Sequence, residues 1–100
     1  RNLDELLEFL KKREKDFSVI IACAGLSAAL PGIVAAKVKL PVIGVPLVAG
    51  PLAGIDALLS IIQLPKGVPV ATMATMGLGK QGILNAVLFA ERILALAKKK

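Results

Sequence analysis

Histidine, tryptophan and tyrosine are absent from this sequence, and cysteine occurs once. Without histidine the chain lacks the residue that most often binds zinc or acts as a general base near neutral pH. One cysteine can form neither an internal disulfide nor the paired-cysteine spacing of a metal site. Three phenylalanines are the only aromatic residues, so the stacking platforms typical of single-strand nucleic-acid binding are missing. The sequence therefore predicts no metal, no cofactor and no nucleic-acid partner.

The positive charge of the chain is concentrated near its two ends. The formal net charge is +6, and seven of the thirteen basic residues lie in Lys11 to Lys15 and Lys98 to Lys100. Such clusters favour a solvated face over a nucleic-acid patch when no recognition motif accompanies them. Cys23 stands in an apolar run, where the expected role is that of a small core residue. A lone cysteine and no recognisable signal peptide favour a cytoplasmic protein.

Aliphatic side chains dominate what is present. Hydrophobic residues make up 56% of the 100 residues, and aromatic residues account for only 3%. A chain of this length forms one domain, close to the size at which a single core just sustains folding. So much aliphatic surface exceeds what one small core can hide, and the excess favours contact with another subunit. We therefore expect a homo-oligomer.

The run from Phe17 to Ala36 carries no charge and is long enough to suggest a transmembrane helix. Gly25, Pro31 and Gly32 interrupt it where a strand would turn into a helix. Two further apolar runs follow at similar spacing, so buried parallel strands explain all three runs at once. We expect no membrane partner.

Strands and helices alternate along the predicted chain. An amphipathic helix from Asn2 to Lys15 comes first, with acidic residues early and basic residues late. The predicted elements that follow are a strand over Phe17 to Cys23, a helix from near Pro31 to about Lys37, a strand over Val42 to Val45, a helix from about Ala53 to Gln63, a strand over Val68 to Met73 and a helix from Gly79 to Lys98. This alternation predicts an α/β fold with a three-stranded parallel sheet and about four helices.

The handedness of the connections predicts which helix lies on which face of the sheet. Right-handed crossovers put the two helices that join consecutive strands on one face. Only the last helix is then free to cover the other face. It is apolar around much of its circumference from Ile83 to Ala97, so it could also cover a neighbouring subunit.

Several segments resemble the PurE family of carboxyaminoimidazole ribonucleotide mutases. Gly25 to Gly32, Gly-Leu-Ser-Ala-Ala-Leu-Pro-Gly, is similar to the family loop Gly-Gly-Ala-Ala-His-Leu-Pro-Gly, and Leu40 to Pro46, Leu-Pro-Val-Ile-Gly-Val-Pro, is a second match. Leu52 to Leu59 resembles Leu-Asn-Gly-Leu-Asp-Ser-Leu-Leu, and Gln63 to Thr72 resembles Gln-Met-Pro-Gly-Gly-Val-Pro-Val-Ala-Thr. Matches in this order span nearly the whole chain from Val19 onward.

The resemblance implies a three-layer, flavodoxin-like fold for residues 1–100, without the first two strands of the family. In the family those strand ends hold the phosphate and the catalytic groups, in Gly-Ser-x-Ser-Asp and Ser-Ala-His-Arg segments. Neither segment occurs here, and Arg1 is similar to the arginine directly after the family's catalytic histidine. The loop at Gly25, Ser27 and Ala28 would line the place of the substrate base and migrating carboxylate, as a vestigial nucleotide site. A simple tight turn is the alternative for that loop.

Positions that are polar in the family carry aliphatic side chains here. By the resemblance, Ala29 replaces the loop histidine, Ala53 an asparagine and Ala57 a serine. Loss of such groups weakens a ligand site and favours packing. The pattern is typical of a truncated, degenerate or engineered family member.

Two functional hypotheses remain open. The first is a non-catalytic, self-associating structural domain on a PurE-like scaffold. The second is a purine-biosynthesis mutase whose amino-terminal catalytic segment is supplied separately or was removed. Since acid–base chemistry needs a proton donor and acceptor near working pH, the missing histidine favours no activity of the chain alone.

Further candidates are an interface and two minor features. The expected subunit contacts are the edge of the strand Phe17 to Cys23 and, on the last helix, Leu88, Phe89, Ile93 and Leu96. Asp56, near the start of a helix, is expected to cap it or to serve a polar structural role. Gly77 to Lys80 resembles half a phosphate loop, a weak signal for which a plain loop is the simpler interpretation.

Overall fold

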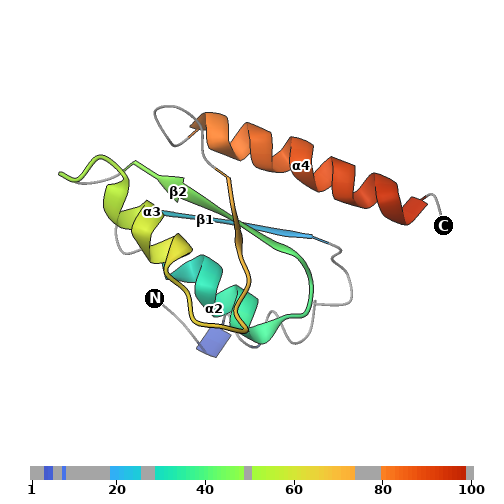
Figure 1. Ribbon diagram of the computed structural model, residues 1–100, viewed down its shortest axis with the longest axis horizontal. Coiled ribbons are helices and arrows are strands. Elements are labelled where there is room, and N and C mark those ends of the chain that lie inside the picture. The colour runs from blue at the N-terminus through green and yellow to red at the C-terminus, as the bar shows by residue number, and fades with distance from the viewer. Residues whose placement is uncertain are drawn as a thin grey trace.

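A computed structural model of the chain describes residues 4–5, 8, 19–25, 29–48, 51–73 and 80–98, without the side chains of residues 80, 97 and 98. Strands and helices alternate as predicted (Figure 1). The elements are β1 (Ile20–Gly25), α2 (Leu30–Lys37), β2 (Val42–Leu47), α3 (Ile55–Ile62), β3 (Ala71–Thr72) and α4 (Lys80–Lys98). The α/β fold and the three-stranded parallel sheet are confirmed. Of the predicted first helix, only Asp4, Glu5 and Glu8 belong to the described residues, and all three are helical.

The sheet has the order β1-β2-β3, and both pairings are parallel. Ile20 pairs with Val42 and Gly25 with Leu47, so β1 and β2 are aligned over their whole length. Parallel strands need long crossover connections, which α2 and α3 supply here. β1 was predicted to end at Cys23 but ends two residues later, at Gly25, because its pairing with β2 continues to Leu47.

The third strand is shorter than predicted. The prediction was a strand over Val68 to Met73, but only Ala71–Thr72 pairs with β2. Val68 donates its N–H to the Pro65 carbonyl oxygen at 3.2 Å in a turn. Pro69 has no N–H to donate to a ladder. The start of the predicted strand is therefore a connecting segment.

Two helices cover one face of the sheet and α4 covers the other, as the crossover rule predicts (Figure 1). Alternate residues of β2 point to opposite faces. On the first face Val42 packs with α2 residues in a cluster that contains Val34, Ala35 and Val38. On the second face Ile43 and Val45 pack with Ala86 of α4. This is the three-layer arrangement that the sequence predicted.

The uncharged run from Phe17 to Ala36 does not form one continuous helix. Its described part divides into β1 and most of α2, which the breakers at Gly25 and Pro31 separate. Pro31 lies in the first turn of α2, where a missing backbone N–H costs no helical hydrogen bond. No helix in the described ranges is both long enough and apolar enough to cross a membrane.

Gly44 lies where the sheet and the two helices meet in close contact. A Cβ atom built on Gly44 would lie 2.9 Å from Val70 Cγ1, 3.0 Å from Ile61 Cγ2 and 3.1 Å from Pro31 Cβ. These three atoms belong to the β3 side, to α3 and to α2, so a side chain would push against three elements at once. The glycine is required by space and not by backbone conformation.

We expect Gly44→Ala to destabilise the fold by about 1–3 kcal/mol, because overpacking a filled core forces its neighbours apart. Gly32→Ala is the matched control. Its Cβ would meet only the Leu64 side chain, with Cδ2 at 2.9 Å, and the end of a leucine can rotate away. Urea unfolding followed by circular dichroism would measure both. Equal midpoints for Gly44→Ala and the parent would contradict this account of the packing.

Candidate functional site

The carboxyl edge of the sheet is the natural place for a site in a parallel α/β fold. Gly25 and Leu47 end β1 and β2 side by side. The helices α2 and α3 both begin at this edge, with Ala29 and Gly54 as their N-cap residues. Loops and helix N-termini therefore converge here.

The structure describes only part of the predicted loop site. Gly25 is the last residue of β1 and is half-buried. Ser27 and Ala28 lie outside the described residues, as do Gly77, Leu78 and Gly79 of the predicted half phosphate loop. The vestigial nucleotide site consequently stays a prediction, with Gly25 placed at the expected edge.

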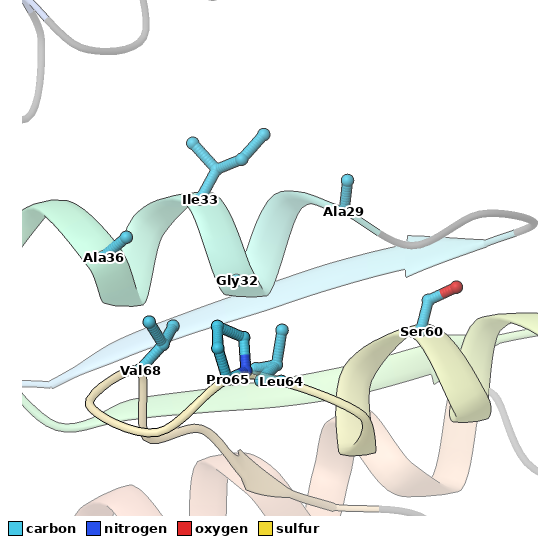
Figure 2. A pocket seen from close by; sticks show the side chains of 8 residues that line it. All are labelled: Ala29, Gly32, Ile33, Ala36, Ser60, Leu64, Pro65 and Val68. Atoms are coloured by element: carbon cyan, nitrogen blue, oxygen red, sulfur yellow. The ribbon is translucent and has the colours of Figure 1, made fainter.

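A groove starts near this edge and runs along α2 toward the opposite edge, between α2 and the segment from Ser60 to Val68 (Figure 2). Its volume is about 490 Å³. It is lined by Ala29, Gly32, Ile33, Ala36, Ser60, Leu64, Pro65 and Val68. Among the described lining residues, only Ser60 contributes a polar side chain, and its Oγ already donates a hydrogen bond of 2.9 Å to the Asp56 carbonyl oxygen. A polar nucleotide needs several converging polar groups, so this groove suits apolar packing.

Sequence reasoning missed the groove, although one signal for it was available. Ala29, Gly32, Ile33 and Ala36 recur at positions i, i+3, i+4 and i+7, which places them on one side of a helix. Small side chains in that pattern leave a shallow surface next to α3. The depth of the groove also depends on Leu64 and Val68, which only the tertiary fold brings opposite α2 (Figure 2).

Asp56 occupies the first turn of α3, where the helix dipole favours a negative charge. The expected capping hydrogen bond is not made, since the N-cap residue is Gly54 and no side chain caps the helix in the described structure. The Oδ1 atom of Asp56 is buried and has no hydrogen-bond partner among the residues that the structure describes. The favourable first-turn position of Asp56 is therefore confirmed, a side-chain cap is not observed among the described residues, and the alternative polar structural role stays a prediction.

Cations of the connecting segments lie at the opposite edge. Lys37 ends α2, Lys39 precedes β2 and Lys66 lies in the turn before β3. All three positions are at the edge where the strands begin. Within the described ranges, no group of three or more metal-ligating side chains is close enough together to hold a metal ion.

Cys23 lies on the α4 face of β1 and packs against the cluster of Ile43, Val45 and Ala86. Burial raises the pKa of its thiol above the ordinary value. A raised pKa keeps the thiol protonated at neutral pH, and the protonated form is a poor nucleophile. The predicted role as a small core residue is confirmed.

The four predicted interface residues of α4 do not share one environment. Leu88 and Leu96 are 56% and 64% exposed, and Phe89 is 39% exposed. Ile93 is half-buried against the sheet of its own chain. Two strongly exposed residues, Leu84 and Val87, were missed, although Leu84 lies one helical turn before Leu88, at i and i+4, and three residues before Val87.

The two flanks of α4 differ in chemistry. Asn85, Leu88, Phe89 and Arg92 line a hollow of about 210 Å³ with Met73, directly after β3. The flank of α4 that carries both polar and apolar side chains therefore lies on the β3 side of the helix. Val87 and Leu94 point in the opposite direction around the helix, at 100° per residue, and so overhang the β1 side. The flank next to the open strand edge thus carries the exposed side chains of Val87 and Leu94, with the exposed Glu91 between them.

Comparison with known proteins gives the family. Residues 1–100 match the profile of the family described as AIR carboxylase. The chain belongs to the AIR carboxylase family. This finding confirms the resemblance to the PurE mutases on which the sequence interpretation depends.

Similar members of the AIR carboxylase family carry the name N5-carboxyaminoimidazole ribonucleotide mutase. The protein from Escherichia coli (strain K12) is 48% identical over 96 residues, which are 95% of this chain and 55% of that protein. The protein from Bacillus subtilis (strain 168) is 51% identical over 96 residues, with coverages of 95% and 57%. The protein from Mycobacterium tuberculosis (strain ATCC 25618 / H37Rv) is 58% identical over 71 residues, with coverages of 71% and 41%. The chain spans about half the length of the curated relatives it matches.

The family resemblance explains a strained residue at the carboxyl edge. Ala53 has φ 54°, in the left-handed region, and Gly54 follows it with φ 92°. The family segment that resembles Leu52 to Leu59 has asparagine at the position of Ala53. Asparagine enters this region several times more readily than other non-glycine residues. Ala53 therefore keeps a backbone conformation that suits the residue it replaces.

We expect Ala53→Asn to stabilise the chain by ~0.5–1 kcal/mol, because the left-handed conformation costs an ordinary L-residue roughly 1–2 kcal/mol. Ala53→Val should destabilise it, since a β-branched side chain fits this region worst. Urea midpoints would order the three chains as Asn above Ala above Val. A midpoint for Ala53→Val at or above that of the parent would show that the strain is absent.

Proposed function

We propose that the chain is one part of an N5-carboxyaminoimidazole ribonucleotide mutase domain and that it acts only together with the rest of such a domain. The observation that carries this proposal is the match of residues 1–100 to the AIR carboxylase family, with 48–51% identity to enzymes of that name over 95% of the chain. The chain spans about half the length of these relatives. In this assignment it supplies the strand ends and helix starts of the carboxyl edge.

The side chains of this chain favour a structural contribution to a mutase domain over mutase activity of the chain alone. Moving a carboxyl group between two atoms of a nucleotide needs a proton donor and acceptor with a pKa near working pH. The sequence has no histidine. Ala29, at the resemblance position of the loop histidine, presents only a methyl group to the groove (Figure 2). In this proposal the acid–base group comes from another part of the domain.

A second candidate function is a non-catalytic domain that associates with copies of itself. The specific observation is the outer edge of β1, beyond which the described structure has no further strand. Ile20 donates its N–H to the Pro41 carbonyl oxygen at 3.0 Å, toward β2. Because successive residues alternate, the N–H and C=O groups of Ile21 and Cys23 face away from β2. Open edges of this kind bind other strands.

Exposed apolar side chains next to that edge support the same candidate. Leu84, Val87 and Leu94 of α4 are exposed on or near the flank that overhangs β1. A strand edge and an apolar helix flank together form a surface that a second copy could cover. For either candidate we propose a cytoplasmic location, which the lone cysteine and the membership of a nucleotide-converting family support.

We expect the purified chain alone to convert no carboxyaminoimidazole ribonucleotide, and mixing it with the part of the Escherichia coli relative that lies outside the match to give turnover. Ala29→His alone should add nothing, because catalytic groups that act as a unit are strongly non-additive. The assay needs a production host without its own mutase. Turnover by the chain alone would contradict the proposal, as would a stable but inactive mixture.

We expect the isolated chain to be oligomeric at micromolar concentration and Leu88→Glu to weaken the association. Burying a leucine contributes roughly 1.5–3 kcal/mol, so the dissociation constant should rise by at least about tenfold. Gln81→Glu is the control, since it adds the same charge at an exposed polar position of α4. Sedimentation equilibrium decides. A folded, monodisperse parent monomer would refute self-association, and an unchanged oligomer for Leu88→Glu would assign it to another surface.

A further inference from the structure

One carboxylate oxygen of Asp56 has no function in the fold described so far. The Oδ1 atom is buried without a hydrogen-bond partner, whereas the backbone oxygen of the same residue accepts the Ser60 hydroxyl at 2.9 Å. Buried polar atoms in folded proteins are almost always hydrogen-bonded. A buried acceptor without a donor destabilises the state that contains it. This oxygen therefore needs a physical explanation.

The position of Asp56 in α3 does not provide that explanation. The helix dipole favours an acidic residue in the first turn, but it also does so when the carboxylate is exposed to water. The N-cap residue is Gly54, and Asp56 makes no capping hydrogen bond within the described residues. Neither effect requires the oxygen to be buried.

The surroundings of α3 show where the carboxylate lies. Asp56 and Ser60 are one turn apart on the same side of α3, and Ser60 faces α2 across the groove (Figure 2). Ala57, the next residue, packs with Ala24 near the end of β1. Asp56 is therefore at the carboxyl edge, between the starts of the two helices and close to the end of β1.

We propose that Asp56 is a positioning residue whose Oδ1 atom accepts a hydrogen bond from an N–H or O–H donor that the rest of the mutase domain brings to the carboxyl edge. This inference rests on the proposed function, because the donor belongs to a completing segment. By completing segment we mean the part of the mutase domain that lies outside this chain. The described residues supply no donor, although the atom is already buried. Asp56 then holds the completing segment in register with the helix starts, at a cost in stability to the chain alone.

The proposal predicts that the parent, Asp56→Asn and Asp56→Ala rank in one order for the melting temperature of the isolated chain and in the opposite order for affinity to the completing segment. In the isolated chain, Asp56→Ala removes the unpaired oxygen and should raise the melting temperature by about 4–8 °C, the shift that one kcal/mol gives in a domain of this size. Asp56→Asn keeps an uncharged acceptor and should fall between Ala and Asp. With the completing segment the order reverses, because the acceptor is then used. Asp56→Ala should bind that segment about tenfold more weakly than the parent, and Asp56→Asn should recover part of the loss.

The experiment measures melting temperatures of the isolated variants and their affinity for the labelled part of the Escherichia coli relative that lies outside the match. Ser60→Ala is the control, since its hydroxyl is on the same side of α3 but is satisfied within the chain. It should change melting temperature and affinity little. Affinity is read by fluorescence anisotropy, which does not depend on turnover.

Each outcome decides between the two ideas. A parent complex that forms without turnover contradicts the proposed function, while the order of affinities still tests Asp56. An unchanged or lower melting temperature for isolated Asp56→Ala overturns the inference, as does equal affinity of Asp56→Ala and the parent. A lower melting temperature for isolated Ser27→Ala, absent when Asp56 is already alanine, would assign the donor to the chain's own loop and also overturn it. A parent chain that binds no such segment overturns both.

Discussion

The burial of β2 on both faces is the constraint on which the rest of the structure depends. Val45 is 0% exposed and Ile43 is 1% exposed, so the central strand has no contact with water along these positions. Parallel pairing to β1 and β3 requires crossover helices, and right-handed crossovers put α2 and α3 on one face. The other face of β2 must then be covered by α4, which contributes the fully buried Ala86. Layer order, helix placement and the location of the carboxyl edge all follow from this one strand.

The sequence was sufficient for the architecture because continuous apolar runs and breakers are local signals. The uncharged run ending at Ala36 was correctly divided at Gly25 and Pro31, and the faces of the helices followed from handedness. The start of β3 was wrong because Pro69 interrupts the ladder, which pattern alone did not weigh against the apolar run. The groove and the buried oxygen of Asp56 could not be read from the sequence. Both depend on which side chains the tertiary fold brings opposite one another.

The carboxyl edge combines a well-preserved scaffold with few chemical groups. Identity of 48–51% to the mutases extends over 95% of the chain, yet the groove that starts near this edge has a single polar side chain, Ser60, among its described lining residues. Ala53 shows the same combination, since its left-handed backbone remains where the family segment has asparagine. Scaffold similarity alone therefore describes where chemistry could occur and not whether it does.

The alternating backbone of β1 gives this strand two different relations to solvent. Amide groups in register with Ile20 are held by β2, whereas those of Ile21 and Cys23 point to the outer edge. Exchange of amide hydrogens with water depends on such hydrogen bonds. Every second amide of β1 is consequently a reporter of what lies beside the strand. A neighbour that adds a strand at this edge would also protect the amide hydrogens of Ile21 and Cys23 from exchange. Amide exchange measured residue by residue along β1 therefore shows whether the outer edge is paired.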